Sequence, residues 1–145
     1  MIDIEETKVG AHALLVTNEG KIILQQRDNN PGIVNPCLIS MFGGSSRRGD
    51  LPEDCLKREL AEELELDVTL YKVEKLEVFN KTKEIDGQDY EANVFVIKNV
   101  HSENLKIHEG KGFVCDYAKE LLKLDKLTRI TKLSLESYID SQNKF

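Results

Sequence analysis

The sequence predicts a mixed α/β fold, in which strands pack between helices around one hydrophobic core. Two pairs of apolar segments each flank a short polar turn, as the strands of antiparallel hairpins do. A leucine-rich amphipathic helix is predicted between these pairs, and two more helices are predicted near the carboxyl terminus. This order favours a mixed α/β sandwich over a regularly alternating parallel sheet.

The first predicted hairpin joins residues 11–17 to residues 21–27 through a short turn that ends in Gly20. Residues 28–37 contain two prolines, a glycine and three asparagines, so we expect an exposed loop that could wall a binding site. A short apolar run, residues 38–42, then leads into a pair of glycines.

The central helix is predicted to begin close to residue 51. Asp50 can cap the free backbone N–H groups, and Pro52 suits the first turn. Successive residues of an α-helix are rotated by about 100°, so side chains three and four positions apart share a face. The leucines therefore share one face and the glutamates an adjoining one: Leu56, Leu60 and Leu64, and Glu59, Glu62 and Glu63.

The second predicted hairpin joins residues 70–79 to residues 90–98 across the turn sequence IDGQD. Two terminal helices are predicted from about Asp116 to Leu122 and from about Leu127 to Asp140, with apolar spacing that can cover a sheet face.

Length and composition indicate one domain. The chain has 145 residues, of which 40% are hydrophobic and 32% charged, which fits a single domain over residues 1–145. The apolar runs are too short to span a bilayer, and the amino terminus has no signal-peptide core. Cys37, Cys55 and Cys115 are widely separated, so we expect reduced thiols and neither a disulfide framework nor a zinc site. We therefore expect a cytoplasmic protein without a membrane partner.

The formal net charge of −6 would repel a nucleic-acid backbone, so we do not expect duplex nucleic acid as a partner. An acidic protein can still bind a small phosphorylated ligand if a divalent cation lies between its carboxylates and the phosphates.

The helix sequence RELAEEL, residues 58–64, offers such carboxylates. Spacings of three and four residues bring Cβ atoms to about 5–6 Å, so the like charges repel unless a cation such as Mg²⁺ or Mn²⁺ is bound. Taken alone, the pattern is more typical of a solvated helix face, with Arg58 paired to Glu62 four residues later.

A longer stretch, GGSSRRGDLPEDCLKRELAEELEL, distinguishes these alternatives. It resembles the Nudix hydrolase signature (the Nudix box) G-x5-E-x7-R-E-U-x-E-E-x-G-U, in which U is aliphatic. Asp50 stands where the family has its first glutamate, and Glu65 stands where it has its second glycine. The remaining positions agree: Gly44, Arg58, Glu59, Leu60, Glu62, Glu63 and Leu66.

The resemblance implies the Nudix α/β/α sandwich, with a mixed sheet and the box helix on one face. It places a strand around Phe113 and Val114, before the terminal helices. It implies hydrolysis of a small nucleoside diphosphate derivative, such as a nucleotide sugar, an ADP-ribose-like compound or a nucleoside triphosphate.

The resemblance also implies roles for individual residues. Glu59, Glu62 and Glu63 would bind Mg²⁺ or Mn²⁺, and Glu62 or Glu63 would accept the proton of the attacking water. The further candidates are Arg58 and the later carboxylate Glu109 for catalysis, with Glu103 second to Glu109, and Gly43, Gly44, Arg27, Arg47 and Arg48 for substrate binding. We assign no role to the three histidines.

The two departures leave alternatives open. We expect Asp50 to act mainly as the helix cap, and Glu65 either strains a left-handed turn or changes the helix exit. A catalytically weak nucleotide-binding or regulatory Nudix domain is the main alternative. An isopentenyl-diphosphate-isomerase-like enzyme, suggested by LQQRD and Cys37, is a remote one. The oligomeric state is open, with a homodimer among the alternatives.

Overall fold

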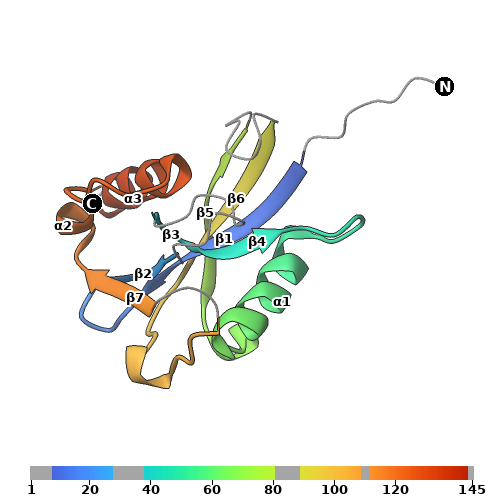
Figure 1. The fold of residues 1–145 in the computed structure, drawn as a ribbon, viewed down its shortest axis with the longest axis horizontal. Coiled ribbons are helices and arrows are strands. Elements are labelled where there is room, and N and C mark those ends of the chain that lie inside the picture. Colours follow the sequence, from blue (N-terminus) through green and yellow to red (C-terminus); the bar gives the residue numbers. More distant parts are fainter. Residues whose placement is uncertain (1–7, 28–37, 81–88, 109–111, 144–145) are drawn as a thin grey trace.

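A mixed sheet runs through the computed structural model, which describes residues 8–27, 38–80, 89–108 and 112–143 (Figure 1). Its strands follow the order β3-β2-β1-β6-β5, while β4 pairs with β1 and β7 pairs with β2. Their bounds are β1 (Lys8–Val16), β2 (Ile22–Gln26), β3 (Ile39–Ser40), β4 (Phe42–Ser45), β5 (Val73–Phe79), β6 (Tyr90–Ile97) and β7 (Gly112–Asp116).

The central strand β1 changes partner along one edge, pairing antiparallel with β4 over Gly10–Ala13 and with β2 at Leu15 and Val16. Along its other edge it pairs parallel with β6, from Lys8 opposite Tyr90 to Leu15 opposite Ile97. This parallel pair within an otherwise antiparallel arrangement makes the sheet mixed, as predicted.

The sheet is covered on both faces, which confirms the α/β/α sandwich (Figure 1). One face carries α1 (Pro52–Leu64), and the other carries α2 (Ala118–Leu121) and α3 (Arg129–Gln142). Two short 3₁₀ helices, η1 (Val68–Leu70) and η2 (Ser102–Asn104), follow α1 and β6. No helix in the described ranges is both long and apolar enough to cross a membrane.

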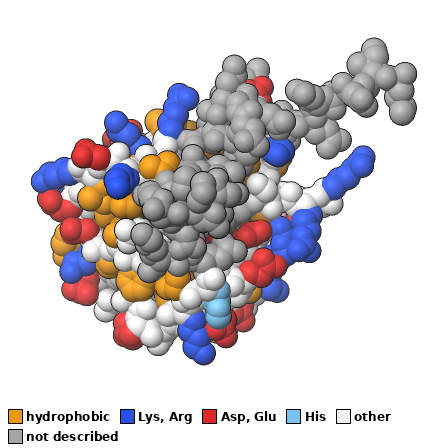
Figure 2. All heavy atoms as spheres, in the orientation of Figure 1, with side chains coloured by type: hydrophobic (Ala, Val, Ile, Leu, Met, Phe, Trp, Pro, Cys, Tyr) orange, Lys and Arg blue, Asp and Glu red, His pale blue; other side chains and the backbone are white. Residues whose placement is uncertain are grey.

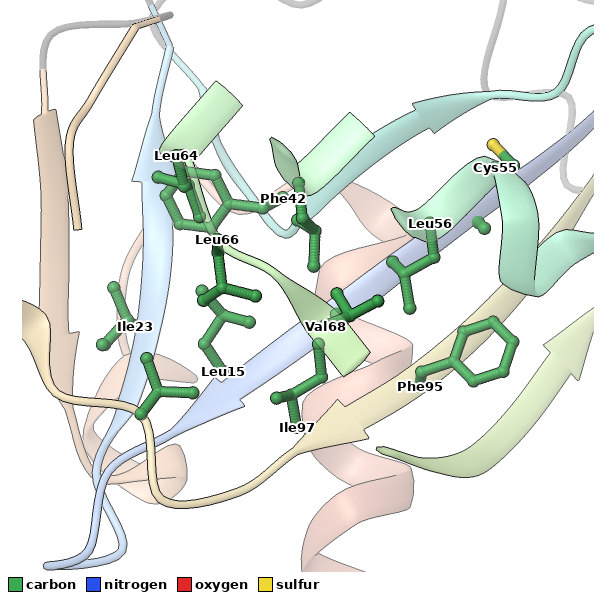
Figure 3. Packing of buried hydrophobic residues seen from close by; sticks show 14 residues of the cluster. Leu15, Ile23, Phe42, Cys55, Leu56, Leu64, Leu66, Val68, Phe95 and Ile97 are labelled. Carbon is green, nitrogen blue, oxygen red and sulfur yellow. The ribbon is translucent and has the colours of Figure 1, made fainter. Parts of the chain in front are cut away.

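Each face of β1 contributes to its own core, because successive side chains of a strand point to opposite sides. Ala11, Ala13 and Leu15 pack toward α1, whereas Leu14 and Val16 pack toward α2 and α3. The three predicted leucines of α1 are at most 1% exposed and meet Phe42, Phe95 and Ile97 of the sheet (Figure 3). Burying a leucine side chain contributes about 1.5–3 kcal/mol, so this face fixes α1 on the sheet.

The hairpins predicted from sequence are confirmed, with β1 antiparallel to β2 and β5 antiparallel to β6. The strand expected from residue 70 begins at Val73, because residues 68–70 form η1. The loop at 28–37, and with it Cys37, lies outside the described residues. Cys55 and Cys115 are free thiols, as expected.

The terminal helices begin later than predicted. Asp116 still belongs to β7, so α2 starts at Ala118. Leu127 bridges to Ile39, and α3 starts at Arg129, after Thr128, whose side chain accepts a hydrogen bond from the Thr131 backbone N–H. The strand expected around Phe113 is β7.

Candidate active site

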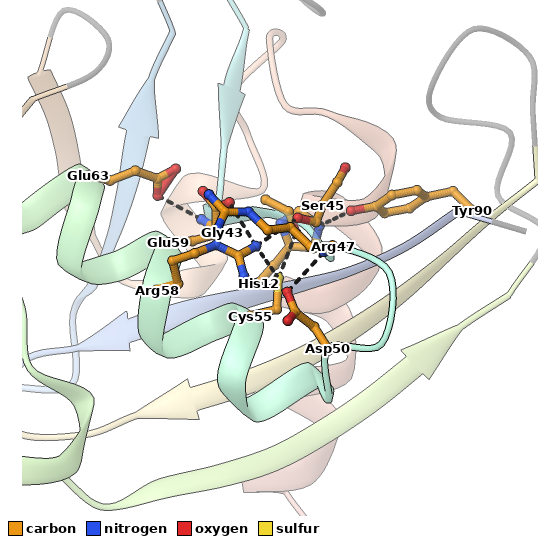
Figure 4. A network of polar contacts seen from close by, with 11 residues as sticks. His12, Gly43, Ser45, Arg47, Asp50, Cys55, Arg58, Glu59, Glu63 and Tyr90 are labelled. Carbon is orange, nitrogen blue, oxygen red and sulfur yellow. Dashed lines mark hydrogen bonds and ion pairs between the residues drawn. The ribbon is translucent and has the colours of Figure 1, made fainter.

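The turn between β4 and α1 is closed by Asp50 (Figure 4). Its Oδ2 atom accepts a hydrogen bond from the Arg47 backbone N–H at 2.9 Å and lies 2.5 Å from Nη1 of Arg58. The N-cap of α1 is Leu51, and no side chain bonds the cap. The prediction that Asp50 caps the helix is therefore wrong, because the arginine of the same motif holds its carboxylate.

The ion pair between Asp50 and Arg58 stabilises both charges. The hydrogen bond from Arg58, followed by that from the Arg47 backbone, lowers the pKa of Asp50 below its ordinary value. The same hydrogen bond raises the pKa of Arg58. Both groups therefore stay charged at neutral pH.

Arg58 links the turn to the sheet and to the next residue of the helix. Its Nη2 atom donates to the Ser45 carbonyl oxygen at 3.3 Å and lies 3.6 Å from Oε1 of Glu59. The structure thus pairs Arg58 with Asp50 and Glu59 rather than with Glu62.

Glu63 is bonded to β4 through a glycine. Its Oε2 atom accepts a hydrogen bond from the Gly43 backbone N–H at 3.0 Å, and the residue is only 3% exposed. Gly43 has a φ of 141°, a conformation that residues with side chains rarely adopt. A glycine is therefore needed where the backbone N–H meets the Glu63 carboxylate.

Glu59 occupies the space that a side chain at Gly44 would fill. A Cβ atom added at Gly44 would lie 2.6 Å from Cδ and 2.7 Å from Oε2 of Glu59. Each of the two glycines thus contacts a carboxylate of the same helix, Gly44 that of Glu59 and Gly43 that of Glu63.

The chain as a whole matches a known family. Residues 6–137 match the family described as the NUDIX domain. The chain belongs to the Nudix hydrolase family.

Solved structures share this Nudix fold at low sequence identity. The MutT protein from Methanosarcina mazei Go1 has a TM-score of 0.81 and 18% identity, over 98% of this chain and 100% of its own. The E. coli ORF135 protein has a TM-score of 0.76 and 22% identity, over 95% and 92%. The E. coli dihydroneopterin triphosphate pyrophosphohydrolase has a TM-score of 0.73 and 14% identity, over 94% and 99%. No functionally curated protein matches the sequence.

The third glutamate of the Nudix box, Glu62, is exposed to solvent on α1. Within the described ranges, no three His, Cys, Asp or Glu side chains are gathered as metal ligands are. The donor set still fits Mg²⁺ or Mn²⁺, because these ions prefer carboxylate oxygens and the missing Cβ of Gly44 leaves room for Glu59.

The remaining candidates lie after β2, in η2 and in the turn before α1, or outside the described residues. Arg47 and Arg48 are exposed at the protruding turn between β4 and α1, where Figure 2 shows basic side chains beside acidic ones. Arg27 follows β2 and is partly exposed. Glu103 belongs to η2 and lies 3.8 Å from Nδ1 of His101, and Glu109 is outside the described residues.

The Nudix glycine that Glu65 replaces marks a left-handed turn that this chain keeps. Glu65 has φ 53° and ψ 35°, its backbone N–H bonds Ala61, and the Leu66 N–H bonds Leu60. The Glu65 carboxylate accepts a hydrogen bond from Nε2 of His108 at 2.7 Å. This bond, followed by the charge of Lys106, lowers the pKa of Glu65.

One partly buried histidine, given no role from sequence, lies on β1 beside the Nudix box. His12 is paired with Gly43 across β1 and β4, and its Nε2 atom lies 2.9 Å from the Tyr90 hydroxyl oxygen. Burial and then the charge of Arg27 lower the pKa of His12 to about 4. His12 is therefore neutral at neutral pH. The sequence gives no local signal for this position, because the neighbours of His12 are set by the pairing of β1 with β4 and by the contact with Tyr90.

Proposed function

We propose that this protein is a Mg²⁺- or Mn²⁺-dependent pyrophosphohydrolase that cleaves the diphosphate linkage of a small nucleoside diphosphate derivative. One observation carries the proposal: Glu59 and Glu63 lie against the glycine pair of β4, and Arg58, held by Asp50, lies beside Glu59. A solvated helix face would leave all these side chains exposed, whereas Glu63 is buried.

Carboxylates from α1 would hold the ion. Glu59 and Glu63 are fixed at the glycines, and Glu62, exposed on the same helix, can turn toward an ion beside them. When bound, the ion neutralises phosphate charge and acidifies a coordinated water. Arg58 keeps the Glu59 carboxylate oriented, and either Glu62 or Glu63 accepts the proton of the water.

Phosphate groups of the substrate would meet the backbone of Gly43 and Gly44 and the side chains of Arg27, Arg47 and Arg48. An arginine fork matches phosphate oxygens, and the exposed Arg47 and Arg48 can reach a ligand that approaches the box from solvent. The fold is shared with a MutT protein and with a triphosphate pyrophosphohydrolase, which supports phosphoanhydride cleavage as the reaction. Glu109 is our candidate for the later carboxylate of the site.

A substrate screen with Mg²⁺ tests the proposal. Nucleotide sugars, dinucleotides, ADP-ribose and nucleoside triphosphates would be incubated with the protein, and phosphate-containing products identified. We expect a nucleoside phosphate from at least one class, and no product after chelation of the metal. Glu109→Gln should lower turnover more than it lowers Mn²⁺ affinity.

Glu62→Gln and Glu63→Gln should both abolish Mn²⁺ binding and turnover, because each removes one charge from the ligand set. Unchanged Mn²⁺ affinity in both variants would contradict the metal site. Absence of any product from the wild-type protein would contradict hydrolysis and favour a binding or regulatory domain.

A further inference from the structure

The chain after η2 crosses the carboxyl-terminal end of α1 (Figure 1). Residues 105–108, here the 105–108 segment, donate two backbone hydrogen bonds to it. Lys106 N–H bonds the Leu64 carbonyl at 3.2 Å, and His108 N–H bonds the Glu63 carbonyl at 2.9 Å. The last four carbonyls of a helix have no partner within it, so the segment supplies two of the partners that α1 needs.

Side chains of the 105–108 segment alternate between two environments. Leu105 and Ile107 pack against the core under α1. His108 instead meets Glu65, 43 residues earlier in the chain, with its Nε2 atom 2.7 Å from Oε2. Lys106 lies 4.0 Å from the same oxygen. The two outward-facing side chains of the segment, Lys106 and His108, thus both approach the Glu65 carboxylate.

Glu65 occupies a backbone conformation that disfavours it. Its φ of 53° lies in the left-handed region of the backbone. Glycine and asparagine adopt this region readily, whereas a residue with a longer side chain is strained there. Strained residues persist where the surrounding structure requires them, and such positions concentrate at functional sites. The replacement of the family glycine therefore has a specific consequence here, which is the contact with His108.

We propose that Glu65 is a positioning residue, whose carboxylate holds His108 and so keeps the 105–108 segment on the end of α1 that carries Glu63. Glu63 is then held from both sides, its carbonyl by the His108 N–H and its carboxylate by the Gly43 N–H. Loss of the Glu65 contact frees the segment, lets the last turn of α1 fray, and displaces the Glu63 carboxylate. The inference rests on the proposed function, in which Glu63 acts.

Glu65→Asn and Glu65→Gln form a matched pair for the test. Asparagine suits the left-handed turn but is too short to reach His108, whereas glutamine keeps the length and an acceptor oxygen. With Mg²⁺ and the nucleotide that wild-type protein hydrolyses fastest, Glu65→Asn should lower kcat by about 10-fold or more, because small misplacement of a catalytic group is costly. Its KM and its thermal midpoint should not fall, and Glu65→Gln should keep wild-type kcat within about threefold.

His108→Ala should lower kcat by the same factor as Glu65→Asn, and the double variant should be no slower than either, as for two groups that act through one contact. Glu120→Asn is the control, since Glu120 is equally exposed (50% against 51%) and ion-paired with Lys123 at 3.1 Å, but lies on α2. It should leave kcat unchanged.

Three results would overturn the inference alone while wild-type turnover stands. These are an unchanged kcat in Glu65→Asn, an equal loss in Glu65→Gln, and additive losses in the double variant. An absence of wild-type turnover against the whole panel would instead overturn the proposed function, and this inference with it.

Discussion

Asp50 and Arg58 join the first and middle parts of the Nudix box through one ion pair, which crosses the turn before α1. The carboxylate that this chain carries in place of the family's glutamate is therefore long enough to reach its partner. Through Arg58, the pair also bears on Glu59. The consequence is that Asp50 belongs to the support of the acidic site rather than to the helix start.

Asp50→Asn should reduce turnover by about 10-fold, because the uncharged amide holds Arg58 less firmly and Glu59 loses an oriented neighbour. Asp50→Glu should keep turnover, since a glutamate also reaches the guanidinium. Neither variant should lose a helix cap, because Leu51 is the N-cap. Steady-state kinetics and thermal unfolding of both variants check this. Wild-type turnover in Asp50→Asn would show that the pair has no role in catalysis.

Gly44→Ala should weaken catalysis without unfolding the protein. The new Cβ would meet the Glu59 carboxylate, which is the end of a flexible side chain and can move away. We expect turnover to fall about 100-fold from displacement of Glu59, with a thermal midpoint within ~4 °C of wild type. Gly20→Ala is the control, because Gly20 has φ 86° and an empty surrounding, so its substitution strains only the backbone. Full activity in Gly44→Ala would argue against a role for Glu59.

Mg²⁺ should raise the thermal midpoint of the wild-type protein. An ion at 100 times its dissociation constant stabilises the folded state by about 2.7 kcal/mol, which corresponds to roughly 5–10 °C for a chain of this size. Glu63→Gln should fold but lose this shift, because glutamine has the same shape and no charge. Glu136→Gln, on the exposed side of α3, should keep it. Equal shifts in all three proteins would place the ion elsewhere.

His12 should make the stability of the protein depend on pH below neutrality. Its pKa is about 4 in the folded protein and 6.5 as the ordinary value, so the unfolded chain binds the proton more tightly. Neutral His12 therefore contributes its full share to the free energy of unfolding above pH 6.5. This contribution, about 3 kcal/mol, is lost as the pH falls toward 4.

His12→Gln removes this dependence, because glutamine does not titrate. Urea unfolding of both proteins, at several pH values from about 7.5 down to 4.5, gives the difference in their unfolding free energies. Carboxyl groups with lowered pKa values, such as Asp67 and Glu74, lose stability equally in both proteins and cancel. We expect the unfolding free energy of the wild-type protein, relative to that of His12→Gln, to decrease as the pH falls. A constant difference would mean that His12 titrates normally.

Much of this fold could be predicted from sequence because its determinants are local. Apolar segments that flank short turns predicted both hairpins, and leucines at a spacing of four residues predicted the buried face of α1. Such patterns depend on residues that are close together in sequence. They therefore predict an element and its apolar face correctly wherever the tertiary structure buries that face.

The errors concern residues whose partners are set by tertiary structure. Asp50 has the local sequence of a helix cap. Its carboxylate is instead bound by Arg58, eight residues later in the chain. Glu65 was recognised only as a missing glycine, since its contact with His108 spans 43 residues. The burial of Glu63 follows from the approach of β4, and a helical pattern alone gives no sign of it.

The parallel pairing of β1 with β6 also constrains how the protein acquires its structure during synthesis. The contact between His12 and Tyr90, which joins these strands, spans 78 residues. At a synthesis rate of about 5–20 residues per second, β1 exists for roughly 4–16 s before β6 is made. During that time one edge of the central strand is an open template for pairing with other chains. The nascent protein is therefore most exposed to aggregation before residue 97 is added, and chains that terminate earlier keep that edge permanently.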